Sequence, residues 1–139
     1  MKYLHTAVRV SDMDAALAFY TGTLGLKVIK RFNGTKRPCS IAFLAAPGDE
    51  HAQIEIVHYW DEQERAARGT FSHIAYEVED IYATCREMMD KGAVIAHPPR
   101  DGFMAFVKSN DGISFELFNR GGPRPPEEPW ASMPDQADW

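Results

Sequence analysis

The sequence predicts an α+β protein built from two paired βαβββ modules, and two internal sequence repeats support this prediction. The stretch around His5 recurs around His73, each time as a short alternating strand that leads into a helix start. The stretch around Glu55 recurs around Glu116, near the end of each copy. Internal repetition fixes an architecture more firmly than local propensity does. We therefore interpret the chain as one module written twice, with a His on its first strand and a Glu on its last.

Strands and one helix follow in order along the first module. Successive side chains of a strand point to opposite faces, which places His5 and Arg9 on one face of the opening strand. A helix cap at Ser11 or Asp12 follows, and the helical apolar period after it ends at Gly25. The segments with strand periodicity or strand-length apolar runs are residues 3–10, 26–32, 39–45 and 52–59.

The second module repeats this order. Its first strand holds His73, and its helix runs from Asp80 to Lys91, where Gly92 provides a C-terminal stop. The Asn-Asp-Gly sequence at residues 110–112 indicates a tight turn between the last two strands. The remaining strands are expected near residues 93–96, 103–108 and 113–119.

The chain divides into two modules, a linker and a tail. The first module covers residues 1–60, the linker 61–70, the second module 71–119 and the tail 120–139. The linker is charged and contains Ala, which is typical of a brief helix at most. The tail is rich in Pro and is predicted to be extended or disordered, with Trp130 and Trp139 free to dock on a surface.

Composition and charge exclude several classes of protein. The hydrophobic content of 45% and the charged content of 25% are ordinary globular values. The formal net charge of −5, without a stripe of Lys and Arg, disfavours a nucleic-acid surface. No apolar run has membrane-spanning length, and the first residues lack the apolar core of a signal peptide. Cys39 and Cys85 lie in no metal or redox spacing, so we expect a soluble cytoplasmic protein.

The residues that point to chemistry are His5, Glu55, His73 and Glu116. Each lies mid-strand with apolar neighbours on the opposite face, so each is expected to point into the concave side of a sheet. Burying four ionisable groups costs free energy unless they share a partner such as a divalent cation. Two imidazoles and two carboxylates suit Ni²⁺, Co²⁺, Zn²⁺, Mn²⁺ or Fe²⁺. One such His alone is more often a packed or surface residue, and it is the equivalent placement of all four that favours a metal.

Five short motifs occur in a fixed order along residues 2–119. They are Leu4-His5-Thr6 with Val8-Arg9-Val10, Phe19-Tyr20 with Leu24-Gly25-Leu26, Gln53-Ile54-Glu55-Ile56, Ser72-His73-Ile74-Ala75, and Ala105-Phe106-Val107 with Asp111-Gly112 and Phe115-Glu116-Leu117. Together they resemble glyoxalase I, the lactoylglutathione lyase family of the vicinal oxygen chelate superfamily. Each motif alone is weak, whereas the ordered set with four ligand positions is specific.

The resemblance implies a fold, an assembly and a metal. The fold is a pair of βαβββ modules that form a cupped mixed sheet. The assembly is a homodimer with its sites between chains, so that His5 and Glu55 come from one chain and His73 and Glu116 from the other. A His at the first ligand position resembles the bacterial class that prefers Ni²⁺ or Co²⁺, with Zn²⁺ and Mn²⁺ as alternatives.

The resemblance also implies an activity, the isomerisation of the hemithioacetal of methylglyoxal and glutathione to lactoylglutathione via an enediolate. Family analogy makes Glu116 the main base and places Glu55 on the opposite face of the substrate. The metal is a Lewis acid in this scheme. The role would be methylglyoxal detoxification. No redox cofactor is required, and the sequence has no Gly-rich phosphate-binding pattern.

Several positions depart from the family pattern near the thiol cosubstrate. Arg9 matches the Arg that meets a glutathione carboxylate in the family. Val57 and Tyr59 stand where the family has Thr and Asn, and Glu77 stands where it usually has an uncharged residue. If Arg9 and Glu77 share a cavity, Glu77 neutralises the Arg that would meet glutathione. If they are exposed instead, they form a strand-end salt bridge worth about 0–1 kcal/mol. We expect Arg9, Tyr59 and Glu77 to bind substrate, with the identity of the thiol left open.

Two alternatives to glyoxalase I remain open. One keeps the metal but changes the reaction to that of another vicinal oxygen chelate enzyme, such as an epimerase, a dioxygenase or a thiol transferase. Relatives linked to fosfomycin resistance or ring cleavage generally use three protein ligands, so Glu55 as a fourth favours the isomerase. The other alternative is a metal-free protein that binds a small molecule on the same fold, and the intact ligand positions argue against it.

Overall fold

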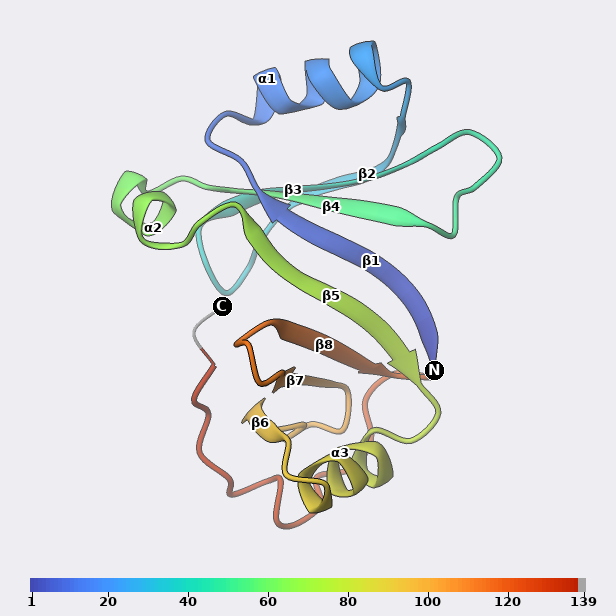
Figure 1. The fold of residues 1–139 in the computed structure, drawn as a ribbon, viewed down its shortest axis with the longest axis vertical. Helices are drawn as coiled ribbons and strands as arrows, with labels where there is room; N and C mark the ends of the chain where they lie inside the picture. The colour runs from blue at the N-terminus through green and yellow to red at the C-terminus, as the bar shows by residue number, and fades with distance from the viewer. Residues whose placement is uncertain (138–139) are drawn as a thin grey trace. The chain divides into compact units, whose positions relative to one another are not determined.

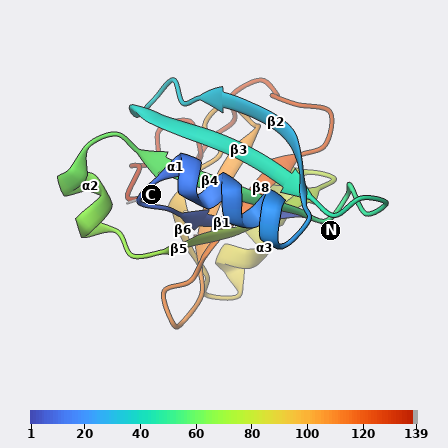
Figure 2. The same cartoon turned by 90° about the horizontal axis from the view of Figure 1, so that it is seen from above.

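The computed structural model describes residues 1–137 and separates the chain into two compact units. The N-terminal unit contains residues 4–72, and the C-terminal unit contains residues 1–3 together with the chain from residue 73 onward. Each module has the predicted order of strand, helix and three strands (Figures 1 and 2). The predicted α+β class with two βαβββ modules is therefore confirmed.

The N-terminal unit contains a mixed sheet in the strand order β2–β3–β4–β1. β1 runs parallel to β4, whereas β3 is antiparallel to both β2 and β4. The strands are β1 (Lys2–Arg9), β2 (Lys27–Asn33), β3 (Cys39–Ala45) and β4 (Gln53–Tyr59). All four lie close to their predicted bounds.

The helix α1 (Met13–Leu17) lies along one face of this sheet (Figure 1). Asp12, one of the two predicted caps, begins it, because the Asp12 carboxylate accepts a hydrogen bond of 2.9 Å from the amide of Ala15. The helix packs on the sheet through an apolar cluster whose buried members are Met13, Ala42, Leu44 and Ile56.

The same helical segment continues as a π-helical turn, η1 (Ala18–Thr23), which the sequence pattern does not predict. The amide of Leu24 donates to the carbonyl of Phe19 at 3.0 Å, five residues back. The Thr21 hydroxyl donates to the Leu17 carbonyl at 2.7 Å. Such a side-chain bond competes with the regular backbone ladder and is a local reason for the wider turn.

The predicted linker does contain a brief helix, α2 (Glu62–Ala67), which Asp61 caps by accepting a 2.9 Å hydrogen bond from the amide of Glu64. The longest α-helix in residues 1–137 is α3 (Ile81–Asp90). No helix in this part of the chain combines the length and the apolarity needed to cross a membrane.

The C-terminal unit repeats the arrangement, with the strand order β5–β8–β7–β6. β5 runs parallel to β8, and β7 is antiparallel to both β8 and β6. The strands are β5 (Phe71–Val78), β6 (Val94–His97), β7 (Met104–Lys108) and β8 (Ser114–Asn119). The predicted turn at residues 110–112 joins β7 to β8, and Gly112 takes the left-handed φ of 79° that the turn requires.

Two side chains define where α3 begins. Asp80 caps it by accepting a hydrogen bond of 3.0 Å from the amide of Ala83. The side-chain carbonyl of Asn119 accepts from the amide of Ile81 at 3.1 Å, which ties the end of β8 to the start of the helix. Gly92, with φ of 90°, follows the helix at the predicted stop.

Of the two predicted states of the Pro-rich tail, extended or disordered, the structure shows the extended one through residue 137: this stretch forms no helix or strand and packs on the C-terminal unit. Trp130 is fully buried in the main core cluster of the unit. The Tyr82 hydroxyl donates to the Pro125 carbonyl at 2.8 Å, and His97 Nδ1 lies 2.7 Å from Asp135 Oδ2. Apolar burial of the indole, together with these polar contacts, offsets part of the conformational entropy lost when a Pro-rich segment is ordered. Trp139 lies outside the described residues.

Candidate functional site

The N-terminal unit brings the first predicted His and Glu into contact. His5 on β1 and Glu55 on β4 are 6% and 8% exposed, and His5 Nε2 lies 2.9 Å from Glu55 Oε2. The two strands are parallel neighbours, and Ala7 is the register partner of Glu55. His5 and Ala7 share a face by strand alternation, so this register places the imidazole beside the carboxylate.

The C-terminal unit builds the same pair from the second copy. His73 on β5 and Glu116 on β8 are each 7% exposed, and His73 Nε2 lies 3.0 Å from Glu116 Oε2. Ala75, two positions after the His, is the register partner of Glu116. The repeat therefore reproduces the sequence, the strand register and the contact between the two side chains.

An aromatic ring packs edge-on against each His, a role that was not predicted for either ring from the sequence. The Phe43 ring lies 5.0 Å from the His5 ring in a T-shaped arrangement, and Phe106 lies 5.4 Å from His73 in the same way. Each Phe is also the register partner of the Glu in its unit. The Ala-Phe pair that precedes a Leu or Val in both copies is the sequence signal for them. These rings limit the rotation of the imidazoles and give each pair an apolar wall.

The donor set of each pair fits a divalent cation. Nε2 and carboxylate oxygen are usual ligands of first-row metals, with bonds of about 2.0–2.2 Å. Two ligand atoms at right angles on such an ion lie about 3 Å apart. The His5–Glu55 and His73–Glu116 contacts of 2.9 and 3.0 Å match that spacing. Each unit therefore presents two ligand atoms at a distance that neighbouring positions of an octahedral ion would accept.

Arg9, predicted to bind substrate, is engaged with the first residue of β5 and with the loop that precedes it. Its Nη1 donates to the carbonyl of Phe71 at 2.6 Å and to that of Gly69 at 3.4 Å. Its Nε is buried and has no hydrogen-bond partner within residues 1–137. An unpaired buried donor of a charged group costs free energy, and an N–H group of this kind donates a hydrogen bond to any carboxylate that reaches it.

Tyr59, also predicted to bind substrate, is only 8% exposed and packs with Cys39 and Val57. The Arg68 guanidinium lies over its ring, 5.2 Å from the centroid.

Burial, with a smaller contribution from the Glu55 carboxylate, raises the pKa of the Cys39 thiol. A raised pKa favours the protonated thiol at physiological pH.

Glu77, the third predicted substrate-binding residue, accepts a hydrogen bond from Arg120 Nε at 3.0 Å. Arg120 also pairs with Glu79, and these two carboxylates raise the pKa of the guanidinium further. The carboxylate of Glu77 thus has a cationic partner within its own unit. The suggested pairing of Glu77 with Arg9 stays a prediction.

Residues 2–117 match the family profile described as Glyoxalase/Bleomycin resistance protein/Dioxygenase superfamily. The chain belongs to this superfamily. A relative named probable lactoylglutathione lyase from Synechocystis sp. is 36% identical over 124 residues, which are 85% of this chain and 95% of the relative. The lactoylglutathione lyase of Haemophilus influenzae is 33% identical and shares 85% of this chain and 92% of its own length.

Among solved structures, the methylmalonyl-CoA epimerase of Mycobacterium tuberculosis superposes on this superfamily member with a TM-score of 0.67. The match covers 89% of each chain at 26% identity. The resemblance to glyoxalase I drawn from the motifs is thus confirmed at the level of the family, and the relatives named lactoylglutathione lyase are enzymes. The superfamily also includes epimerases, so the family alone does not select the reaction.

Proposed function

We propose that this protein is a metal-dependent isomerase that converts the hemithioacetal of methylglyoxal and glutathione to lactoylglutathione. The observation that carries the proposal is the duplicated buried pair, His5 with Glu55 and His73 with Glu116, at 2.9 and 3.0 Å. The relatives named lactoylglutathione lyase support the choice of reaction. A small molecule is therefore the expected substrate.

In this proposal His5, Glu55, His73 and Glu116 hold one divalent metal, with Ni²⁺ or Co²⁺ preferred. When bound, the metal supplies Lewis acidity that stabilises negative charge on the neighbouring oxygens of the substrate. Glu116 removes the proton from the carbon that bears sulfur, and the resulting enediolate is protonated at the adjacent carbon. The proton leaves one carbon and returns to the next, so the reaction is redox-neutral overall.

Burial gives the two carboxylates their chemical character. Glu116 is 7% exposed and lies beside the Phe106–His73 contact. The carboxylate that removes the carbon-bound proton of the substrate is therefore poorly hydrated. Glu55 has the same surroundings on the opposite face of the substrate and completes the ligand set.

We further propose a homodimer in which each site draws one pair from each chain, as the resemblance implies. Each unit carries its own His–Glu pair, so pairing units from two chains supplies four ligands. The expected result is a dimer whose metal content and activity fall together on dilution. A diluted monomer that keeps full activity would contradict this arrangement.

The decisive experiment measures lactoylglutathione formation by protein loaded in turn with Ni²⁺, Co²⁺ and Zn²⁺, with metal content determined by elemental analysis. The Glu116→Gln variant keeps an oxygen ligand but cannot accept the proton. We expect it to retain the metal and to lose about 10²–10⁴-fold in turnover. Glu62→Gln, at an exposed position of α2, is the matched control and should change neither quantity.

A second candidate reaction is the epimerisation of an acyl-thioester substrate, favoured by the likeness to methylmalonyl-CoA epimerase. Both reactions begin with removal of a proton next to a carbonyl group, so the same carboxylate serves either. Parallel assays with methylmalonyl-CoA and with the hemithioacetal separate them. Turnover of methylmalonyl-CoA alone would overturn the proposal of lactoylglutathione formation and leave the role of Glu116 intact.

A further inference from the structure

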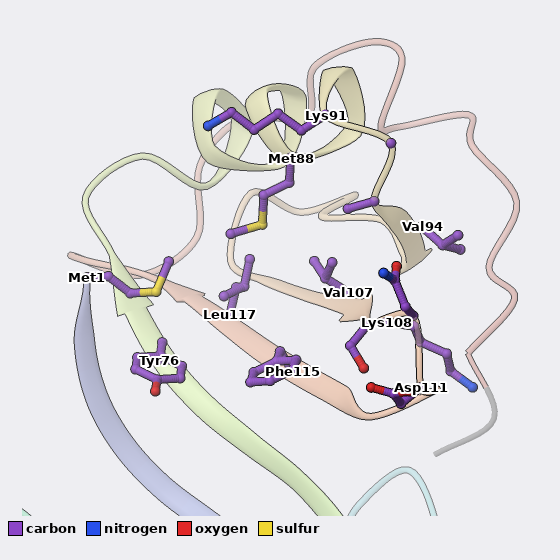
Figure 3. A pocket seen from close by; sticks show the side chains of 14 residues that line it. Met1, Tyr76, Met88, Lys91, Val94, Val107, Lys108, Asp111, Phe115 and Leu117 are labelled. Atoms are coloured by element: carbon purple, nitrogen blue, oxygen red, sulfur yellow. The ribbon is translucent and has the colours of Figure 1, made fainter.

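Each sheet has one face that its helix covers and an opposite face, which we call the site face, that carries the His–Glu pair. In the C-terminal unit Val107 and Leu117 lie on the covered face, where they line a cavity of about 780 Å³ between α3 and the sheet (Figure 3). Phe106 and Glu116 each precede one of these residues and therefore lie on the site face. A substrate at the metal meets the side chains of the site face and not those of the cavity.

The edge strand of the N-terminal unit, β2, contains a β-bulge that turns a lysine onto the site face. The register of β2 with β3 shifts between Val28 and Lys30, because Ile29 is an extra residue without a partner on β3. Lys30 therefore lies opposite Phe43, at the position that Ile29 would take on a regular strand. Phe43 is in turn the register partner of Glu55. Bulges commonly re-aim a side chain beside a functional site, and this one brings a cation into line with a candidate metal ligand.

The second copy contains the same bulge. The register of β6 with β7 shifts between Ile95 and His97, so Ala96 is the extra residue and His97 lies opposite Phe106. In each unit the repeat thus places a basic side chain beyond the Phe that packs on the candidate His ligand. The two basic residues differ in their partners, because His97 Nδ1 lies 2.7 Å from the Asp135 carboxylate. At this register position it is the first copy that offers a cation to a ligand.

Lys30 is held over the aromatic wall of the first His–Glu pair. Its Nζ lies 4.4 Å from the centroid of the Phe43 ring and 5.7 Å from that of the Phe32 ring. The Phe43 centroid lies 5.0 Å from that of the His5 ring, so the ammonium group lies within about 10 Å of the imidazole. Phe32 is 45% exposed and stacks on Phe43 at 6.2 Å. The ammonium group and the two Phe rings therefore form an amphipathic rim along one side of the pair.

The charge of Lys30 has no counter-ion within residues 1–137, where its side chain forms no ion pair or hydrogen bond. Lys27 on the same strand differs, because its Nζ lies 3.7 Å from the Glu50 carboxylate. Glu55, two strands away on the site face, is engaged with His5 at 2.9 Å. An ammonium group over a ring still has N–H groups that point away from the ring, and these donate to an anion. The rim thus presents an exposed cation beside the candidate metal centre.

We propose that Lys30 is a specificity-determining residue that receives a carboxylate of the substrate while the reacting carbon lies at the metal. The inference rests on the function proposed above, in which the substrate carries the two carboxylates of glutathione. Two strand spacings separate Lys30 from Glu55, a span of about 10 Å that an extended tripeptide bridges. Arg9 lies on β1, on the other side of β4, so the two cations serve different carboxylates. The contact with Lys30 is a charge-assisted hydrogen bond, and Phe32 packs on the adjoining part of the peptide.

The test measures binding of S-methylglutathione to the full chain loaded with Ni²⁺, by isothermal titration calorimetry. This thioether cannot form a hemithioacetal, so the readout does not depend on turnover. We expect Lys30→Gln to raise the dissociation constant about three- to tenfold and Lys30→Arg to restore most of the affinity. Lys27→Gln is the matched control, because it removes a lysine of the same strand whose charge is already paired, and it should leave the dissociation constant unchanged.

A ligand without carboxylates separates the charge of Lys30 from its packing. The diethyl ester of S-methylglutathione should bind equally to the wild type and to Lys30→Gln, because the charged contact is absent from both complexes. A Lys30→Gln variant that weakened the ester as much as the acid would show a merely structural role and refute the assignment. Binding of the acid that Lys30→Gln leaves unchanged would overturn this inference alone. A wild type that binds no S-methylglutathione would overturn the proposed function and this inference with it.

Discussion

Trp130 anchors the C-terminal segment in the core of the C-terminal unit, and replacing it by Ala should be among the most destabilising single substitutions in the chain. The side chain is fully buried, and an aromatic side chain buries about 150–250 Å². At about 25 cal/mol per Å² this area corresponds to about 4–6 kcal/mol. Measured losses for Trp→Ala in protein cores are about 3–5 kcal/mol. For a chain of this length the melting temperature should fall by about 10–15 °C.

Trp130→Phe is the matched control, because it keeps most of the packing and removes the indole N–H. The Trp130 Nε1 atom is buried and has no hydrogen-bond partner within residues 1–137. An unsatisfied buried donor costs about 1–3 kcal/mol, which offsets much of the packing lost to the smaller ring. Urea denaturation of both variants measures the difference. If Trp130→Ala lost less than about 1 kcal/mol, or if Trp130→Phe were as unstable as Trp130→Ala, the burial argument would be refuted.

Three further predictions concern charge and substrate. The hydrogen bond from the Ala83 amide, together with Arg124, holds the pKa of Asp80 below its usual range. The stability that Asp80 contributes is therefore present at neutral pH and is lost as the pH falls through that lowered pKa. Urea midpoints at neutral pH and at about pH 3 should therefore differ less for Asp80→Asn than for the wild type. Arg9→Ala should weaken glutathione binding by about 1.5–3 kcal/mol, whereas Glu77→Ala should leave the affinity for glutathione unchanged or higher. KM values for the glutathione substrate that change in the opposite direction in the two variants would indicate a different thiol. Tyr59→Asn should not reduce turnover per folded molecule if glutathione is the cosubstrate, although its thermal stability should fall because a buried ring is lost.

The sequence is sufficient for those features that the repeat determines. The alternation around His5 and His73 locates both opening strands, and the recurrence of Glu55 and Glu116 identifies their partners. Strand register then follows, because each pair lies on neighbouring parallel strands of its own module. The sequence predicts the strands, the His–Glu pairs and their register because each depends on the alternation of side chains along a short strand, and this alternation occurs in both copies.

Features that depend on long-range packing escape such reasoning. Nothing near Trp130 in the sequence resembles a core segment, since its neighbours are Pro, Glu and Ala, and its burial depends on a space left beneath α3. The partner of Glu77 is Arg120, which lies beyond the end of β8 and has no periodic relation to it. The π-helical turn at η1 is accompanied by a hydrogen bond from the Thr21 hydroxyl, which the apolar pattern does not reveal.

The burial of Trp130 also has a consequence for biosynthesis. The core that receives it is assembled from residues that include Ile81, Val107 and Leu117, all of which leave the ribosome earlier. The core is complete except for the indole once Leu117 has been made, and at about 5–20 residues per second the next 13 residues, up to Trp130, take about 1–3 s to translate. During that interval the nascent C-terminal unit exposes an apolar cleft that its own later residues will close. A chain interrupted before Trp130 would keep that cleft open, and chaperones and proteases would have a surface by which to distinguish it from the finished protein.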